Sequence, residues 1–424
     1  MYLSSLKVSR LRSFEQQDVE FVHPGQEKAK DRNGAGVDNV TLLLGNNGAG
    51  KTTVLKAIAL AVLGPVFPNS GFVPECLIRR DTSKNKHKEA KLRAGLSLHG
   101  QDLDSTRGFS KPTLFSLAAA SITRIGDYER IDAGYQDRDA PQPVSGDKQT
   151  LDSERLFDDS SPAFFLLGYG ATRRVASPRS REMLEDRRRG LRYQRVSGLF
   201  EDYVALFPMK LWLPELQQRS KARYKEVCKL LNQLLPEDTE FGGEFEDLQP
   251  VFTHRGVNLP FTALSDGYRG FIGVVADMLY HLQDICPSRR KLTDVCGIVM
   301  IDDVDIHMHP SWQRTVVQTL AKTLPNIQFV MTSHSPILAG TVYSTNIRIV
   351  ESPAKGPSKV RMVDARVHGL NADQVLTGPL FGLESTRSPD QVQKLAEMAA
   401  AVQRRGKPTA SLDFLNELAG KSPE

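Results

Sequence analysis

Residues 45–52 read GNNGAGKT, which fits the spacing G-x-x-x-x-G-K-[ST] of a phosphate-binding loop. In such a loop the glycines let the main chain curl so that successive N–H groups face phosphate oxygens. The ammonium group of Lys51 supplies a charge for the β- and γ-phosphates, and the hydroxyl of Thr52 can ligate Mg²⁺. The candidate nucleotide contacts are Gly45, Asn46, Asn47, Gly48, Ala49, Gly50, Lys51, Thr52 and Thr53.

The flanking residues predict the two elements that this loop requires. Residues 41–44 form a short apolar run, which is typical of a buried strand. Four apolar residues after the loop share one helical face: Leu55, Ile58, Ala59 and Val62. The positive end of this helix would face the phosphates. A chance glycine-rich turn would not bring a strand before it and a helix after it in this order.

Paired carboxylates follow a second apolar run, in the sequence GIVMIDDVD at residues 297–305. A strand there would place Asp302 beside the phosphate loop, where it can hold Mg²⁺ through water. Asp303 would then orient or deprotonate the attacking water. An apolar strand followed by two aspartates is a weak signal alone, and the preceding phosphate loop makes it a good one.

Two further motifs lie near predicted element ends. In LSDGYRG at residues 264–270, Ser265 and Gly267 place a hydroxyl and N–H groups at a helix start, which forms an anion site. We expect it to cap a γ-phosphate held by another subunit; the alternative is a helix cap without a ligand. His334 ends a strand in TSHSP and can contact the γ-phosphate, although a lone histidine is more often structural.

The composition describes an ordinary globular chain whose charge is unevenly spread. It has 424 residues, which allows one large domain with insertions or two to three domains. No apolar run approaches the length of a membrane span, and the four cysteines form no C-x-x-C pair, so we expect a cytoplasmic protein with reduced thiols. The net charge is +5, yet residues 173–195 carry +6 and residues 79–93 carry +5, so positive charge is concentrated in two segments.

In this order, GNNGAGKTT, LSDGYRG, GIVMIDDVDIHMHPSWQ and TSHSP resemble the head of an ABC-type ATPase. The resemblance is to the SMC/RecF-like and OLD-like branch, because of LKVSRLRSF, YGATRR and LTGPLFGLESTRSP. Within that branch the chain is similar to stand-alone ATPases of bacterial anti-phage systems, such as Septu PtuA and retron-associated relatives. This implies an α/β P-loop NTPase fold with a mostly parallel sheet flanked by helices, an antiparallel β-lobe and an inserted helical lid.

The resemblance also implies roles for individual residues. It implies that Lys51, Thr52 and the loop bind ATP and Mg²⁺, that Asp302 is the metal partner, and that Asp303 is at the catalytic position. Ser265 and Gly267 would form a signature that acts in trans. Asp305 would belong to a loop linking two sites across a dimer, and His334 would be the switch histidine. Asp303 replaces the usual glutamate and is one methylene shorter, so hydrolysis is expected to be slow. No glutamine lies between Lys51 and Gln101 to sense the γ-phosphate, and Tyr169 or Arg174 is the candidate substitute.

The resemblance and the patterns together predict a division of the chain. The expected parts are residues 1–100 (first part of the head), 101–163 (variable acidic insertion), 164–178 (return to the head), 179–245 (arginine-rich helical lid), 246–390 (second part of the head) and 391–424 (helical tail). The absence of sustained heptads argues against a long coiled-coil arm.

The arginine block at the start of the lid has two interpretations. It contacts nucleic acid or an acidic partner, or it is a solvated helix face. The candidates are Arg187, Arg188, Arg189 and Arg192.

Three hypotheses of function follow. The leading one is an ATP-gated homodimer or higher oligomer that controls a separate nuclease or toxin in phage defence, since no second catalytic constellation is visible and no room remains for the nuclease domain of OLD proteins. The second is a RecF-like DNA-binding clamp in DNA repair. The third, an energising subunit of a membrane transporter, is disfavoured by LSDGY and HMHPSWQ.

Overall fold

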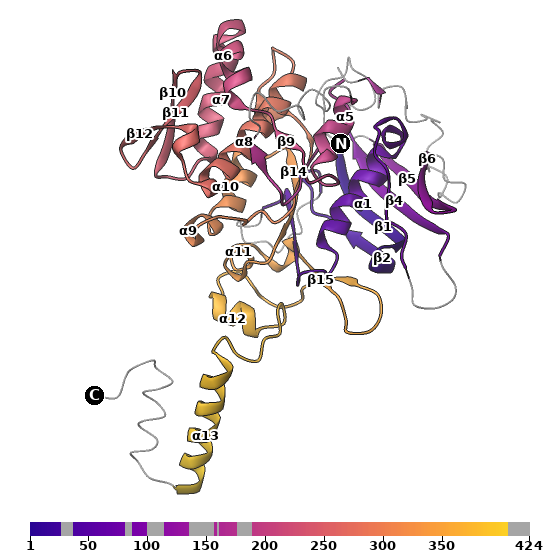
Figure 1. The fold of residues 1–424 in the computed structure, drawn as a ribbon, viewed down its shortest axis with the longest axis vertical. Helices are drawn as coiled ribbons and strands as arrows, with labels where there is room; N and C mark the ends of the chain where they lie inside the picture. Colours follow the sequence, from indigo (N-terminus) through magenta and orange to yellow (C-terminus); the bar gives the residue numbers. More distant parts are fainter. Residues whose placement is uncertain are drawn as a thin grey trace. The chain divides into compact units, whose positions relative to one another are not determined.

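A computed structural model gives the fold of the chain and describes residues 1–26, 37–80, 87–99, 114–134, 157–158, 161–175 and 189–405. The chain forms two compact units, Met1–Gly369 and Leu370–Glu424. The first contains two large sheets and the lid (Figure 1). The boundary at residue 370 differs from the expected one at residue 390.

A six-stranded sheet forms the centre of the first unit, in the order β16–β15–β3–β14–β13–β7. Its strands are β3 (Val40–Leu44), β7 (Leu166–Tyr169), β13 (Gly297–Ile301), β14 (Ile327–Ser333), β15 (Ile347–Glu351) and β16 (Lys359–Met362). All neighbours are parallel except β15 and β16 at one edge. The expected mostly parallel α/β sheet is confirmed.

The parallel arrangement determines where the candidate residues meet. Parallel strands present their carboxyl ends at one edge of a sheet, which is where open α/β sheets bind ligands. The phosphate loop follows β3, Asp302 follows β13, and His334 follows β14. Because these three strands are neighbours in the sheet, their terminal residues come together.

A five-stranded antiparallel sheet forms the N-terminal β-lobe, in the order β2–β1–β4–β5–β6. Its strands are β1 (Tyr2–Leu11), β2 (Phe14–Glu20), β4 (Glu89–Leu98), β5 (Leu114–Ile125) and β6 (Tyr128–Gly134). Helix α1 (Lys51–Leu63) packs against strands of both sheets and is buried almost throughout. The expected antiparallel lobe is confirmed.

The surroundings of α1 also correct the hydropathy analysis. The segment Lys51–Asn69 is long and apolar enough to cross a membrane by composition alone, although no such run was expected. In the structure 72% of that window is buried inside the protein. A helix that is apolar on all sides is typical of the core of a large domain, and both sheets cover this one.

The interpretation of residues 101–163 as a surface insertion is wrong for residues 114–134. These residues form β5 and β6, and β5 pairs with β4 over ten register positions, from Leu98↔Leu114 to Glu89↔Thr123. The polar turns around them concealed the strands. The rest of that prediction, residues 100–113, 135–156 and 159–160, lies outside the described residues.

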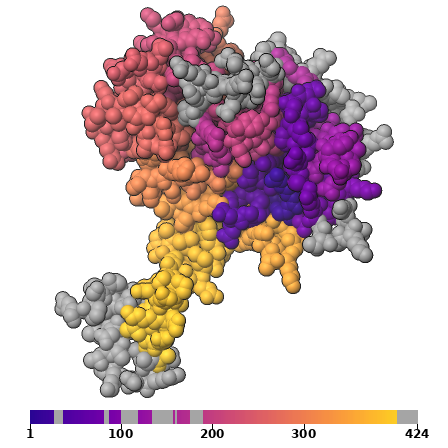
Figure 2. Space-filling view, viewed as in Figure 1, coloured from indigo at the N-terminus to yellow at the C-terminus, as the bar shows by residue number. Residues whose placement is uncertain are grey.

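The lid lies beside the central sheet and combines helices with a small sheet. It comprises α5 (Leu191–Ser197), β9 (Ala205–Leu206), α6 (Met209–Arg219), α7 (Lys221–Leu234), β10 (Thr239–Glu246), β11 (Gln249–His254) and β12 (Val257–Pro260). It packs on α8 (Asp266–Ile285), the helix that begins with the LSDGYRG motif. In Figure 2 the lid, in pink to salmon, and the β-lobe, in indigo to violet, lie on either side of the face shown.

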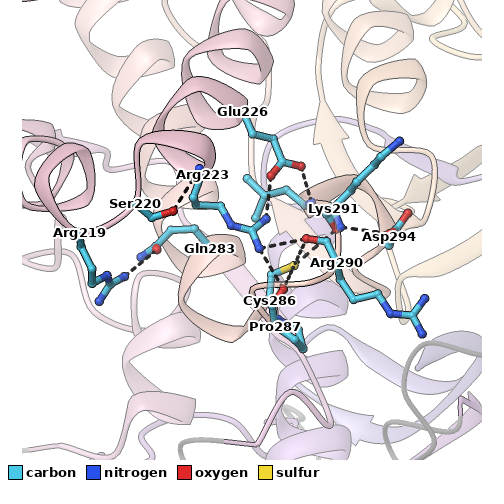
Figure 3. Close-up of polar contacts among 11 residues, drawn as sticks. Arg219, Ser220, Arg223, Glu226, Gln283, Cys286, Pro287, Arg290, Lys291 and Asp294 are labelled. Carbon is cyan, nitrogen blue, oxygen red and sulfur yellow. Dashed lines mark hydrogen bonds and ion pairs between the residues drawn. The ribbon is translucent and has the colours of Figure 1, made fainter.

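Arg223 connects the lid by hydrogen bonds to the residues that follow α8. Its guanidinium donates to Glu226 at 2.7 Å and to the main-chain oxygens of Pro287 and Arg290 at 2.9 and 3.0 Å (Figure 3). Glu226 also accepts from the main-chain N–H of Leu292 at 2.8 Å. Charge-assisted bonds are stronger than neutral ones, and Arg223 is buried. The lid and α8 are therefore joined as one body.

The remaining elements are short, except for the last helix. In the first unit they are β8 (Arg174–Val175), α9 (Pro310–Gln313), α10 (Val316–Thr323), α11 (Pro336–Ala339) and 3-10 turns at Gly64–Asn69, Phe261–Ala263, Leu292–Asp294 and Ser344–Asn346. The second unit contains α12 (Ala372–Thr377) and α13 (Pro389–Arg405). Helix α13 agrees with the expected helical tail up to Arg405, and residues 406–424 lie outside the described part.

Candidate active site

The phosphate loop has a main-chain geometry that side chains would prevent. Gly45 has φ 157° and Gly50 has φ 111°. A Cβ atom on Gly45 would lie 2.1 Å from the carbonyl oxygen of Val350, and one on Gly50 would lie 2.7 Å from the hydroxyl oxygen of Ser13. Close approach and positive φ together require glycine at both positions.

The side chain of Lys51 folds back onto the start of this loop. Its Nζ donates to the carbonyl oxygens of Gly45 and Asn46 at 3.0 and 3.2 Å, and lies 2.7 Å from Nε2 of His334. Burial lowers the pKa of Lys51, while the carboxylates of Asp303, Asp302 and Asp305 oppose that shift. Burial and the neighbouring Lys51 charge lower the pKa of His334. A neutral imidazole can therefore accept from the lysine ammonium group.

Asp302 is a buried carboxylate with two hydroxyl donors. Thr52 Oγ1 donates to its Oδ2 at 2.7 Å, and Thr332 Oγ1 donates to its Oδ1 at 2.6 Å. Across the described ranges, no group of three or more His, Cys, Asp or Glu could hold a metal by itself. Mg²⁺ is usually held by one or two protein oxygens together with phosphates and water. The hydroxyl of Thr52 and the carboxylate of Asp302 fit this kind of site.

Asp303 lies in a turn of unusual conformation. Its φ is 44°, a left-handed value that is uncommon outside glycine and typical of functional sites. The turn is held at its amide, because Asp303 N donates to Thr332 Oγ1 at 2.7 Å. Its Oδ1 lies 3.8 Å from Nε2 of His334. The structure therefore brings Lys51, Thr52, Asp302, Asp303 and His334 to one place.

Arg173 is a residue of the site that the sequence analysis missed. Its Nη2 donates to the carbonyl oxygens of Asp302 and Asp303, the latter at 2.8 Å. Burial lowers its pKa to about 10, opposed by the carboxylates of the turn. Of the two expected substitutes for a glutamine, Tyr169 donates its hydroxyl to Asp277 at 2.8 Å, and Arg174 is exposed in β8. The motif YGATRR thus contributes Arg173 to the site, and the residue that replaces the glutamine stays a prediction.

The signature residues lie elsewhere in the first unit. Ser265 precedes α8 at the N-cap position, and its side chain makes no capping hydrogen bond. A Cβ atom on Gly267 would lie 2.4 Å from the carbonyl oxygen of His307. The start of α8 therefore contacts the segment that follows Asp303. Asp305 lies in that segment, and its buried Oδ1 has no hydrogen-bond partner among the described residues.

The arginine block is largely structural where the structure describes it. Arg192 is 2% exposed and donates to the carbonyl oxygens of Ala163, Asp158 and Ser161, so it is not a surface contact. Arg189 forms an ion pair with Glu201 at 2.6 Å. The burial of Arg192 and its carbonyl partners contradict its interpretation as a nucleic-acid contact. For Arg189, which is partly exposed beside Glu201, that interpretation stays a prediction. Arg187 and Arg188 lie outside the described residues.

Comparison with known proteins identifies the family of this chain. Residues 40–340 match the family described as AAA domain, putative AbiEii toxin, Type IV TA system. The Septu protein PtuA of Bacillus mycoides (strain KBAB4) is 24% identical over 347 residues, which are 81% of this chain and 41% of PtuA. This chain thus spans less than half the length of that relative.

Two further similarities were found. The retron Vc95 probable ATPase of Vibrio cholerae serotype O1 biovar El Tor is 23% identical over 373 residues, covering 74% of this chain and 69% of that protein. A solved SMC head bound to the C-winged helix domain of ScpA covers 86% of this chain and 98% of its own, with 16% identity and a TM-score of 0.48. The expected resemblance to ATPases of anti-phage systems is confirmed, and the family match over most of its length shows that this chain belongs to the AAA domain, putative AbiEii toxin family.

Proposed function

We propose that this chain is an ATP-driven switch that pairs with a second copy around two bound ATP–Mg²⁺ and thereby controls an effector protein in anti-phage defence. One observation carries the proposal. Lys51, Thr52, Asp302, Asp303 and His334 converge at one sheet edge, with contacts of 2.6–3.8 Å among themselves and Thr332. The similarity to Septu and retron proteins supports the setting, and we place the protein in the cytoplasm.

In this proposal each residue of the site has one task. Lys51 exchanges its carbonyl partners for the β- and γ-phosphates of ATP, because phosphate oxygens carry more negative charge than a carbonyl oxygen. Thr52 and Asp302 hold Mg²⁺, which neutralises phosphate charge when bound. Asp303 orients the attacking water, and His334 donates a hydrogen bond to the γ-phosphate. The short side chain of Asp303 makes turnover slow.

Release follows from the same contacts. The segment after Asp303 contacts the start of α8 through His307 and Gly267, so a change at the γ-phosphate reaches the surface that faces a second copy. A ligand can shift such an equilibrium only by its differential affinity for the two states. Loss of the γ-phosphate would remove that difference and open the pair.

The test measures mass and hydrolysis together. Light scattering on the purified chain, with ATP–Mg²⁺, with ADP–Mg²⁺ and without nucleotide, should show dimers only with ATP. Lys51→Ala should abolish ATP binding and dimers, whereas Asp303→Asn should keep ATP binding and prolong the dimer. Lys91→Ala, an exposed lysine of β4, is the matched control and should behave as wild type. A wild-type chain that stays monomeric with ATP refutes the proposal.

The effector is tested separately. Proteins encoded beside this chain should co-purify with it, and ATP should change the mass of that complex. If none binds, and a host without this chain resists phage equally well, control of an effector is refuted while the ATPase remains.

The alternative, a RecF-like DNA clamp, has lost part of its support. It was motivated by the arginine block, in which Arg189 and Arg192 are engaged with protein oxygens. ATP-dependent, salt-sensitive binding to duplex or gapped DNA that Arg187→Ala with Arg188→Ala abolishes would favour it over effector control.

A further inference from the structure

A cavity of about 740 Å³ opens between the lid, the segment after β7 and the start of α8. This volume lies in the range of small-molecule sites. Four basic side chains line it against one carboxylate: Arg173, Arg174, Lys210, Arg269 and Asp266. Arg269 and Asp266 form an ion pair with each other, and Arg173 donates to main-chain oxygens of the catalytic turn. The two cations left over are Arg174 and Lys210.

Arg174 and Lys210 line the same cavity from two neighbouring segments of the chain. Arg174 lies in β8, which pairs in parallel with β9 at Ala205, and the chain continues from β9 through Pro208 into α6. Neither cation has a hydrogen-bond or ion-pair partner in the part of the chain that the structure describes. Lys210 also lies in the first turn of α6, where no acidic residue accompanies it. A cation is unfavourable at that end of a helix, and an anion in the cavity would offset the cost.

The lining of the cavity does not include the phosphate loop of the same chain. Its lining includes Gly267 and the turn residues Ile306 and His307, but no residue of the phosphate loop at 45–53 and not His334. Guanidinium and ammonium groups are the usual partners of phosphate oxygens in proteins. A phosphate bound in this cavity would therefore not be held by the phosphate loop of the same chain.

We propose that Arg174 and Lys210 contact the triphosphate that a second copy of this chain holds in its own phosphate loop. Each ATP then lies between Lys51 of one copy and Arg174 and Lys210 of the other. In a two-fold symmetric pair the same contacts occur twice. This inference rests on the proposed function, because it requires an ATP-dependent pair.

The first experiment uses the double variant Arg174→Gln with Lys210→Gln, which removes both charges and nearly keeps side-chain size. Binding of a fluorescent ATP analogue to the dilute single chain should remain as in wild type. ATP-dependent pairing and hydrolysis should fall about tenfold or more, since each lost charge-assisted contact weakens the paired state. The matched control is Lys225→Gln with Lys229→Gln, which removes two exposed charges of α7 and should change none of these measurements.

The second experiment mixes this double variant with Lys51→Ala, each inactive alone. A mixed pair has two nucleotide sites. One site combines the Lys51→Ala loop with the changed cations, and the other combines an intact phosphate loop with intact Arg174 and Lys210. Mixing should therefore raise hydrolysis clearly above the sum of the rates of the two variants measured separately. If the two cations act on the nucleotide of their own chain, no mixed pair contains an intact site and hydrolysis stays at the background.

The outcomes separate the ideas. No rescue on mixing, with wild type active and paired, overturns this inference alone. Wild type that neither pairs nor hydrolyses ATP overturns the proposed function and this inference with it. If Lys51→Ala still binds one equivalent of free nucleotide that is lost when Arg174 and Lys210 are also changed, the cavity is a free-nucleotide site, and the contact in trans is overturned.

Discussion

Thr332→Val tests whether the left-handed turn at Asp303 is held by one hydroxyl group. Thr332 is fully buried, and its Oγ1 donates to Asp302 Oδ1 at 2.6 Å and accepts from Asp303 N at 2.7 Å. Valine nearly keeps the shape of threonine and removes both bonds, together with a longer one of 3.5 Å from Thr332 Oγ1 to Asp303 Oδ1. Thr332→Ser keeps the hydroxyl and removes only the methyl group, so it is the matched control.

The magnitude follows from the two lost bonds. A hydrogen bond to a charged group contributes about 1.5–3 kcal/mol, and an orphaned buried N–H costs about 1–3 kcal/mol. We therefore expect the free energy of unfolding to fall by about 3 kcal/mol. A left-handed conformation costs a non-glycine residue about 1–2 kcal/mol. In the variant, the hydrogen bond from Asp303 N to Thr332 Oγ1 would no longer offset this cost. Relaxation of the turn should lower kcat about tenfold, since about 1.4 kcal/mol corresponds to a factor of ten.

The assay separates chemistry from binding. Steady-state hydrolysis gives kcat, equilibrium titration with a non-hydrolysable analogue gives the Kd of ATP, and urea unfolding gives stability. Because Thr332 forms no hydrogen bond with Lys51 or the phosphate loop among the described residues, the Kd should stay within about twofold of wild type. Equal kcat for Thr332→Val and wild type, or a loss of ATP affinity larger than the loss of kcat, would refute the argument.

Three further predictions concern other residues. Gly267→Ala should abolish ATP-dependent pairing but not ATP binding, because the new Cβ would lie 2.4 Å from the carbonyl oxygen of His307. Gly270→Ala, whose new Cβ has no atom within 4 Å, should pair normally in light scattering. Equal pairing by both variants would contradict this. Burial raises the pKa of Asp277 to about 6. The folded state therefore binds more protons than the unfolded state between about pH 4 and 6. Above that window, the ionised carboxyl lowers the free energy of unfolding by about 3 kcal/mol. The unfolding free energy of wild type minus that of Asp277→Asn should therefore fall as pH rises through this window in urea titrations, and a constant difference would show that the carboxyl titrates normally. Arg192→Met should lower stability by about 2–3 kcal/mol by orphaning carbonyl oxygens without changing DNA retention in a gel-shift assay, and the reverse pattern would restore this residue to the nucleic-acid hypothesis.

The parts of the site that the sequence analysis found share one property. Each lies within a few residues of the carboxyl end of a strand whose apolar run is continuous, as in GIVMIDD and FVMTSH. Such runs predict buried parallel strands, and parallel strands bring their ends together, so the positions of Asp302 and His334 beside Lys51 were predictable. The strand pattern of residues 114–134 was not recognised, because turns and polar residues on both sides favoured a loop.

The residues that were missed act through main-chain atoms or through a neighbour. Thr332 was read only as part of a strand, and its role depends on facing Asp302 from the adjacent β14. Arg173 was not singled out, because its partners are carbonyl oxygens about 130 positions later in the chain. Arg192 was counted as surface charge, because its carbonyl partners come from residues about 30 positions earlier.

The sequence by itself determined the chemistry and the class of fold: a phosphate loop between strand and helix, paired carboxylates after a buried strand, and a mostly parallel sheet. These features are local, because a loop, its strand and its helix are adjacent in the chain and carry their own spacing. Only the tertiary structure decided which arginine donates to the turn at Asp302 and Asp303, which arginines are buried, and that Arg174 and Lys210 line one cavity. Those outcomes depend on pairs such as Arg173 with Asp303, 130 residues apart, and no local pattern records the register between strands that brings such residues into contact.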